Sequence, residues 1–240
     1  MKKLTLLLFL IIPVITFSQD NQRKNKLESQ VTFSLNSNGI ASIPAFSLDN
    51  PALIASASFK KGRLSYSPIL AYGLDMKPWF IDNWFHYRMI TKPKFEFKTG
   101  INFSTFSSSY KLADEEIIKG ERYFAFSLTG TYNISPESNF TMDYWNDNGL
   151  ETGSISGHFF NLCFNRSGIR LGDKAFLEAN LMLFYINYDG NNDGLFFSPT
   201  ISISAIKIPA SIFFQATQAI DSNISDLPGF KWNLGISYTL

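Results

Sequence analysis

Apolar and polar residues alternate with a period of two through most of the chain after its first 27 residues. In residues 195–206, for example, Ile201 and Ile203 alternate with Thr200 and Ser202. Successive side chains of a β-strand project to opposite faces, so each such segment has one apolar face and one polar face. No long stretch shows the 3.6-residue period of a helix, and the pattern therefore predicts an all-β protein.

Turn-forming residues separate the alternating segments and predict about twelve strands, within a range of 10–14. The expected strands are residues 28–36, 52–60, 63–73, 79–90, 94–106, 121–134, 139–146, 154–165, 175–188, 195–206, 210–219 and 229–240. Every second connection is mostly longer than its neighbours, an alternation typical of membrane barrels. A Greek-key sandwich gives no reason for it. The exception is SGIRLGDK (167–174), which belongs to the set of short connections but is as long as its neighbours.

The first 18 residues have the composition of a secretory signal peptide. Two lysines precede an apolar run at 4–15, and the small residues Thr16 and Ser18 follow. This run is shorter than the ~20 residues of a spanning helix, so we expect cleavage after Ser18 and no membrane anchor. Residues 19–27 are then a polar periplasmic leader, and residues 28–240 form a single barrel domain. The only cysteine, Cys163, excludes an intrachain disulfide.

Composition indicates where such a β domain resides. The chain has 24 Phe and 10 Tyr, but charged residues make up only 17%, below the ~25% of a typical soluble domain. Its net charge of +1 gives no electrostatic reason to bind nucleic acid. In lipid, only helices and closed barrels satisfy all backbone polar groups. With no second apolar run of helical length, we expect an antiparallel up-and-down transmembrane β-barrel.

The chain ends in NLGISYTL (233–240), a cleanly alternating segment. It resembles the C-terminal targeting signal of Gram-negative outer-membrane β-barrel proteins. Asn233, Gly235, Tyr238 and Leu240 occupy the four marked positions, although the final residue of that signal is more often aromatic. The resemblance implies an outer-membrane location, contact with membrane lipid and lipopolysaccharide, and insertion by the barrel assembly machinery.

The terminal strand is expected to pair with the first strand and to present its apolar face to lipid. That face carries Phe230, Trp232, Leu234, Ile236, Tyr238 and Leu240. Aromatic residues are also expected to gather in two belts at the membrane surfaces. The outer belt is predicted to contain Tyr72, Trp79, Tyr144 and Tyr185.

Three classes of function fit these features. The leading hypothesis is a small channel or a structural envelope protein, with no catalytic site and no cofactor. A barrel enzyme that acts on lipid or peptide is the first alternative. The second is a soluble periplasmic β-sandwich that binds a ligand. The sequence does not predict the oligomeric state.

The enzyme hypothesis depends on the two histidines, His86 and His158. Ser156 lies two residues before His158, but their strand carries no carboxylate to orient the imidazole. Asp82 and His86 share a face, yet four strand residues separate them by ~13 Å. We therefore expect no catalytic residues.

A metal site is not expected either. The segment DGNNDG (189–194) has acidic and amide residues, but it lacks the spacing and the terminal glutamate of an EF-hand. Its composition is that of a tight hairpin turn.

Two connections have unusual compositions. Residues 107–120 combine an acidic cluster with Ile117 and Ile118; we expect a solvated loop with a short helical turn, or else a segment that covers the barrel mouth or contacts a partner. Residues 37–51 are rich in Ile, Phe and Pro, which is unusual for a solvated loop. This first connection is expected to fold inward over the lumen.

The hairpin formed by residues 79–90 and 94–106 predicts the lumen lining. Centred near Lys92, it places Arg88 opposite Glu96, His86 opposite Lys98 and Asp82 opposite Asn102. Charges on the lipid side would be costly, so this face should point inward. The expected lumen-lining residues are Asp82, His86, Arg88, Glu96 and Lys98, and Arg88 and Glu96 are expected to be neighbours.

Overall fold

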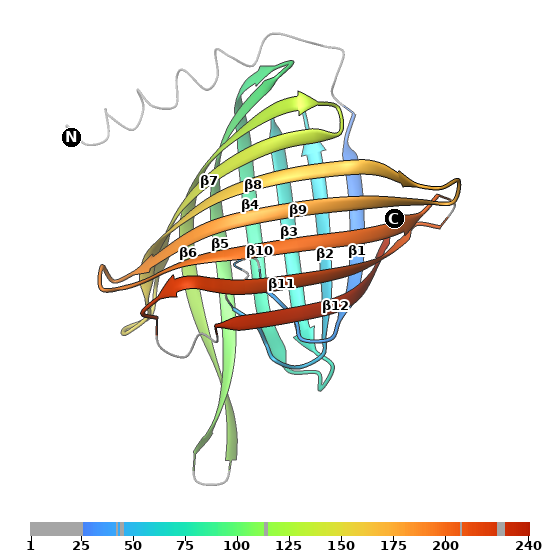
Figure 1. Cartoon of the computed structure of the whole chain (residues 1–240). Helices are drawn as coiled ribbons and strands as arrows, with labels where there is room; N and C mark the ends of the chain where they lie inside the picture. Colours follow the sequence, from blue (N-terminus) through green and yellow to red (C-terminus); the bar gives the residue numbers. More distant parts are fainter. Residues whose placement is uncertain (1–25, 42, 44–45, 113–114, 207, 225–228) are drawn as a thin grey trace, which may run out of the picture.

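The chain folds into a closed antiparallel barrel in which each strand pairs with its sequence neighbours and β12 pairs with β1 (Figure 1). The computed structural model describes residues 26–41, 43, 46–112, 115–206, 208–224 and 229–240. The expected signal peptide, 1–18, and most of the leader lie outside the described residues. The strands are β1 (Glu28–Asn36), β2 (Ala52–Lys61), β3 (Leu64–Gly73), β4 (Pro78–Lys92), β5 (Phe95–Leu112), β6 (Glu115–Ser135), β7 (Ser138–Gly149), β8 (Ser156–Leu171), β9 (Ala175–Tyr188), β10 (Asn192–Ala205), β11 (Ala210–Ser222) and β12 (Phe230–Thr239).

The predicted number of twelve strands is confirmed for the described residues, but several strands are longer than expected. β8 continues to Leu171, so the apparently long connection at 167–174 is in fact a short turn. The short helical turn expected within residues 107–120 is wrong. β5 and β6 continue there as paired strands that project beyond the barrel (Figure 1). Tyr110 lies opposite Ile117, and aromatic and β-branched residues of this kind favour extended structure.

The two ends of the barrel differ in their connections. Residues 62–63, 93–94, 136–137 and 172–174 form short turns at the end where β1 begins and β12 finishes, here called the short-turn end. The opposite end, here called the long-loop end, carries the first connection (37–51) and the projecting β5–β6 hairpin. The alternation of short and long connections is therefore present in the fold.

The terminal strand shows how the two faces of the sheet are used. β12 pairs with β1, with Ile236 opposite Leu35, as expected. Its apolar side chains are exposed on the outer surface, whereas Asn233 faces inward and is only 1% exposed. The exposed members are Phe230, Trp232, Leu234, Ile236, Tyr238 and Leu240. An apolar exterior around a polar interior is the arrangement of a barrel in lipid. Among the described residues no helix is long and apolar enough to cross a membrane.

The predicted outer aromatic belt is wrong for one of its members. Trp79 is only 6% exposed and packs inside the barrel against Ala52, Ala71 and Phe80. The cause is a β-bulge in the pairing of β3 with β4, next to Trp79. A bulge adds one residue to one strand and reverses the alternation of its side chains.

Candidate functional site: the barrel interior

The interior is lined mainly by neutral polar side chains that hydrogen-bond across strands. Asn233 Nδ2 donates to Asn36 Oδ1 at 2.8 Å, and the hydroxyls of Ser198 and Thr217 lie 2.9 Å apart. All four residues are buried. Buried polar groups are stable when they are paired in this way, so these contacts close the seam between β1 and β12 and join β10 to β11.

The five residues predicted to line the lumen lie on the inward side of β4 and β5. Asp82 is only 4% exposed, and the half-buried His86 stacks on Trp84, with 5.3 Å between ring centroids. Arg88 Nη1 lies 3.6 Å from Glu96 Oε2, and Lys98 lies directly opposite Arg88. The interior at the short-turn end therefore has two cations beside one carboxylate.

The predicted register of this hairpin is wrong. Arg88 lies opposite Lys98, His86 opposite Gly100, and Asp82 opposite Ser104. The turn lies at 93–94, nearer the C-terminus than expected, and a β-bulge between Arg88 and Ile90 moves the pairing back by only one residue. The Arg88–Glu96 contact exists in spite of this, because residues offset by two across a pair of strands stay within reach of long side chains.

Replacing Glu96 with alanine is expected to shift the ion selectivity of the barrel toward anions. The substitution leaves Arg88 and Lys98 opposite each other without their neighbouring carboxylate. The change in reversal potential under a KCl gradient measures the effect. Glu28→Ala, at the first residue of β1 and exposed, serves as a control at the same end, and an equal shift in both variants would contradict a role for Glu96.

The two histidines lie in different environments. His158 is on the outer surface, where the Tyr144 hydroxyl lies 2.9 Å from its Nδ1 and the two rings stack. Its neighbourhood is a shallow hollow lined by Tyr144, His158 and Phe160. Neither histidine has a hydrogen bond to a carboxylate among the described residues. The absence of a catalytic centre remains a prediction.

The acidic segment at 189–194 forms the predicted turn. Residues 189–191 connect β9 and β10, and Asp189 and Gly190 have φ values of 50° and 75°. Such left-handed conformations are typical of tight hairpins. Within the part of the chain that the structure describes, no cluster of three His, Cys, Asp or Glu residues is arranged to hold a metal ion.

The first connection enters the barrel, as its composition predicted. Ile40 and Ala41 are buried, and backbone hydrogen bonds from Ala41 to Phe46 and from Leu48 to Gly39 fold it into a small hairpin. Phe46 packs against an apolar cluster on β2–β4 and also against a second cluster on β8–β10. These strands lie on opposite sides of the barrel. The connection therefore spans the interior; we refer to it below as the plug.

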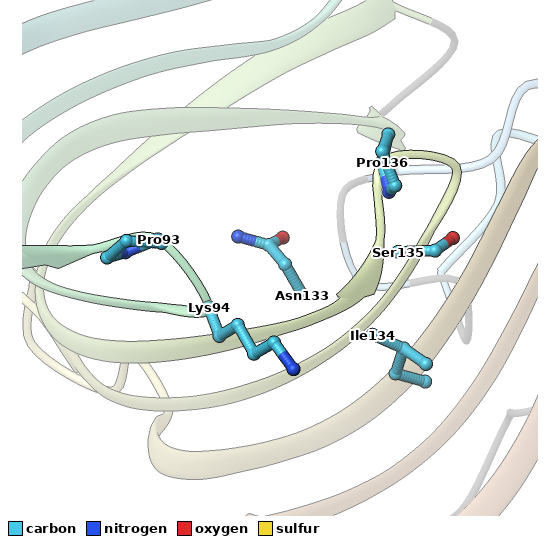
Figure 2. Close-up of a pocket in the computed structure, with 6 residues that line it drawn as sticks. All are labelled: Pro93, Lys94, Asn133, Ile134, Ser135 and Pro136. Atoms are coloured by element: carbon cyan, nitrogen blue, oxygen red, sulfur yellow. The ribbon is translucent and has the colours of Figure 1, made fainter.

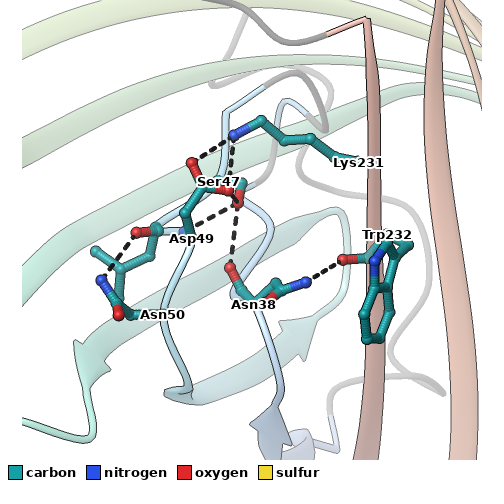
Figure 3. Close-up of polar contacts among 7 residues, drawn as sticks. Asn38, Ser47, Asp49, Asn50, Lys231 and Trp232 are labelled. Atoms are coloured by element: carbon teal, nitrogen blue, oxygen red, sulfur yellow. Dashed lines mark hydrogen bonds and ion pairs between the residues drawn. The ribbon is translucent and has the colours of Figure 1, made fainter.

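Polar contacts hold the plug to β12 at the long-loop end (Figure 3). Lys231 Nζ donates to both carboxylate oxygens of Asp49 at 2.8 Å, and the Ser47 hydroxyl donates to Asp49 at 2.7 Å. Asn38 Nδ2 donates to the Trp232 carbonyl at 2.8 Å. Partial burial alone would raise the pKa of Asp49, but the hydrogen bonds from Lys231 and Ser47 and the charge of Lys231 hold that pKa below its usual range. Asp49 therefore stays ionised, and the ion pair persists at neutral pH.

Two residues of the motif that resembles a targeting signal also have structural roles in the closed barrel. Asn233 Oδ1 accepts hydrogen bonds from the Ser37 hydroxyl and the Asn38 backbone N–H, which joins the plug to β12. A Cβ on Gly235 would lie 2.3 Å from the ring of Phe213 and 2.8 Å from the Leu35 carbonyl. Tyr238 and Leu240 are exposed on the outer surface. The role of the motif in assembly remains a prediction.

Gly235→Ala is expected to destabilise the barrel by about 1–3 kcal/mol, because the added methyl group overlaps the Phe213 ring and backbone. Urea denaturation of the folded barrel in detergent measures the loss. Gly130→Ala is the matched control, because its added Cβ would approach only Phe95, at 3.8 Å. Equal stability of the two variants would contradict close packing at Gly235.

The sequence did not identify the residues that fix the plug. Asp49 and Lys231 are 182 positions apart, and only closure of the barrel brings them together. The apolar composition of residues 37–51 indicated that the segment folds inward. Nothing in it identified Phe46 as the residue that contacts both walls.

Comparisons with known proteins support the fold but not a family. No protein-family model matches the chain, and no curated protein matches its sequence. The structure is similar to "KdgM porin in complex with disordered oligogalacturonate", with a TM-score of 0.57, 8% identity, and coverage of 87% of this chain and 98% of that one. An outer membrane channel from Pseudomonas putida F1 gives 0.53 and 10%, covering 92% and 98%. The NanC porin gives 0.50 and 7%, covering 89% and 100%. The chain therefore has the fold of outer-membrane β-barrels.

Proposed function

We propose that the protein is an outer-membrane channel for small polar solutes, with the plug closing its long-loop half. The observation that carries this proposal is the combination of an apolar exterior with an interior that holds Arg88, Glu96 and Lys98. Charged side chains inside a barrel line a pathway for water and solutes. The proposal includes export by the signal peptide at 1–18 and insertion by the barrel assembly machinery through residues 233–240.

The charges inside the barrel favour cationic or uncharged solutes. Asp143 and Asp147 lie on the inward face of β7, opposite Thr129 and Ala125, and Asp82 lies on the inward face of β4. The similar KdgM porin was solved with oligogalacturonate, an acidic oligosaccharide. Carboxylates along the entry path would repel such a polyanion. We therefore infer that the solute carried by this chain is cationic or uncharged rather than a polyanion.

The filled interior favours a second candidate, a structural barrel of the cell envelope. Phe46 and its neighbours join the two apolar clusters across the interior. A barrel whose plug never leaves would stabilise the envelope without conducting.

Recovery from membrane fractions and bilayer recordings test the proposal. We expect the full chain in the outer-membrane fraction, with heat-modifiable migration on gels and cation-selective conductance in planar bilayers. Recovery in the soluble periplasm would contradict the interpretation as a membrane-inserted barrel. A folded, membrane-inserted barrel that conducts under no condition would support the structural candidate. Hydrolysis of phospholipid by the purified barrel would instead support the enzyme hypothesis.

A further inference from the structure

The two ends of the barrel differ in how many of their charged side chains form ion pairs. At the long-loop end, three ion pairs join a cation to a carboxylate of the same chain, Arg122–Glu151, Lys119–Glu121 and Lys231–Asp49. At the short-turn end, the ion pair among described residues is Arg88–Glu96. Seven exposed cations near its turns form no ion pair within 4.0 Å in the described part of the chain, although Glu28 lies opposite Lys60 in the pairing of β1 with β2. These are Lys60, Lys61, Arg63, Lys92, Lys94, Arg170 and Lys174.

Cations that the protein itself leaves unpaired, gathered at one end, attract external anions. The net charge of +1 does not reveal this uneven distribution of charge, because the excess of acidic residues lies at the other end. At a membrane surface, each lysine or arginine contributes about 1 kcal/mol of attraction to anionic lipid. The exposed cations of the turns at this end thus favour the anionic headgroups of an adjacent membrane surface.

One hollow at this end has the form of a headgroup site. It measures about 480 Å³ and is lined by the turns at 93–94 and 136–137, through Pro93, Lys94, Asn133, Ile134, Ser135 and Pro136 (Figure 2). Within the described residues, the Lys94 ammonium has no hydrogen-bond partner in the protein. The Asn133 side chain points to the opposite side of the strand from Lys94 and Ile134 (Figure 2). The Glu137 carboxylate accepts a hydrogen bond from the Ser135 hydroxyl at 3.1 Å and does not line the hollow.

The hollow continues into the apolar exterior. Ile134 is exposed on the outer surface beside a row of aromatic side chains, in which Phe95 lies opposite Tyr132 and Tyr132 opposite Phe140. A molecule bound there would meet the Lys94 ammonium at one end and aromatic rings at the other. An anionic phospholipid has this division between a phosphate and acyl chains.

We propose that the short-turn end binds anionic phospholipid of the periplasmic leaflet, and that Lys94, in the hollow beside Ile134, binds the phosphate of one lipid. The acyl chains then lie against Ile134, Phe95, Tyr132 and Phe140. This inference rests on the proposed outer-membrane location, which places the short-turn end in the periplasm.

Native mass spectrometry of the folded full chain in detergent tests the site, with phosphatidylglycerol, phosphatidylethanolamine of the same chain length, and glycerol phosphate as probes. We expect phosphatidylglycerol to bind most tightly. Lys94→Gln should weaken its binding about fivefold, from the loss of one interfacial charge, and Lys94→Arg should largely restore it. Lys111→Gln is the matched control, because Lys111 is exposed on the projecting hairpin at the opposite end.

The outcomes distinguish a phospholipid headgroup from a free phosphate ester as the ligand. Equal binding of the two phospholipids, or equal losses in Lys94→Gln and Lys111→Gln, would overturn the proposed lipid site. Glycerol phosphate binding as tightly as phosphatidylglycerol would show a site for free phosphate esters and would likewise overturn it. The same preparation is recorded in bilayers. A barrel that conducts but shows no lipid preference refutes this inference alone, whereas one that never inserts refutes the proposed function.

Discussion

Replacing Ile236 with lysine is expected to destabilise the folded barrel by about 2 kcal/mol. Ile236 is 54% exposed on the outer surface, between Leu35 of β1 and Ile212 of β11. A lysine facing lipid costs about 2–4 kcal/mol at the membrane midplane and less toward either surface. Because Ile236 lies nearer the short-turn end than Leu234 does, we expect the lower part of that range. Urea denaturation in lipid vesicles measures the loss.

A second lysine substitution controls for the change in charge. Leu64 also faces outward, but it follows directly after the turn at 62–63, beside Lys61 and Arg63. Leu64→Lys should cost at most about 1 kcal/mol, as expected for a position near the membrane surface. If both variants unfold at the same urea concentration as the parent chain, the outer face of β12 does not lie in lipid.

Period-two alternation was sufficient to predict the fold, because a strand with one apolar face must bury or cover that face. The twelve strands and the inward side of Asp82, His86 and Glu96 follow from alternation and from the cost of charges in lipid. Register does not follow in the same way. It depends on where a turn is centred, and one bulge after Arg88 moved every pair beyond it.

Bulges also account for the misplaced aromatic residue. Alternation alone places Trp79 outside, and only the bulge in the pairing of β3 with β4 turns it into the interior. Contacts between distant segments are harder still to predict. The Lys231–Asp49 pair exists because the closed barrel brings β12 beside β1 and the plug folds back inside it.

The largest functional effect is expected from removing the plug. Replacing residues 40–47 with a short Gly-Ser linker deletes Phe46, which packs against both apolar clusters, and removes the small hairpin from the interior. Single-channel conductance in planar bilayers should then rise severalfold over the parent chain. Thermal stability should fall at the same time, because the interior loses buried apolar contacts.

Replacing a loop outside the barrel with the same linker distinguishes the effect of removing the plug from a general effect of shortening the chain. Residues 108–119 of the β5–β6 hairpin project beyond the barrel, and replacing them with the same linker should leave conductance unchanged. If both replacements raise conductance equally, the interior position of the plug does not limit flow. If neither raises conductance, the barrel is too narrow to conduct even when the plug is removed, and the structural role is then the better-supported hypothesis.

The Lys231–Asp49 ion pair allows a milder test of the same closure. Because the pKa of Asp49 is held below its usual range, the pair contributes at all pH values above that range. It is lost as pH falls through the lowered pKa and Asp49 becomes protonated. The conductance of the parent chain should therefore stay constant from neutral pH down to about pH 4, near the ordinary pKa of an aspartate, and rise below it as the plug opens more often. Lys231→Met should open more often at neutral pH and lose most of this pH dependence. A Lys231→Met channel whose opening still rises below pH 4, as it does in the parent chain, would show that another group holds the plug in place.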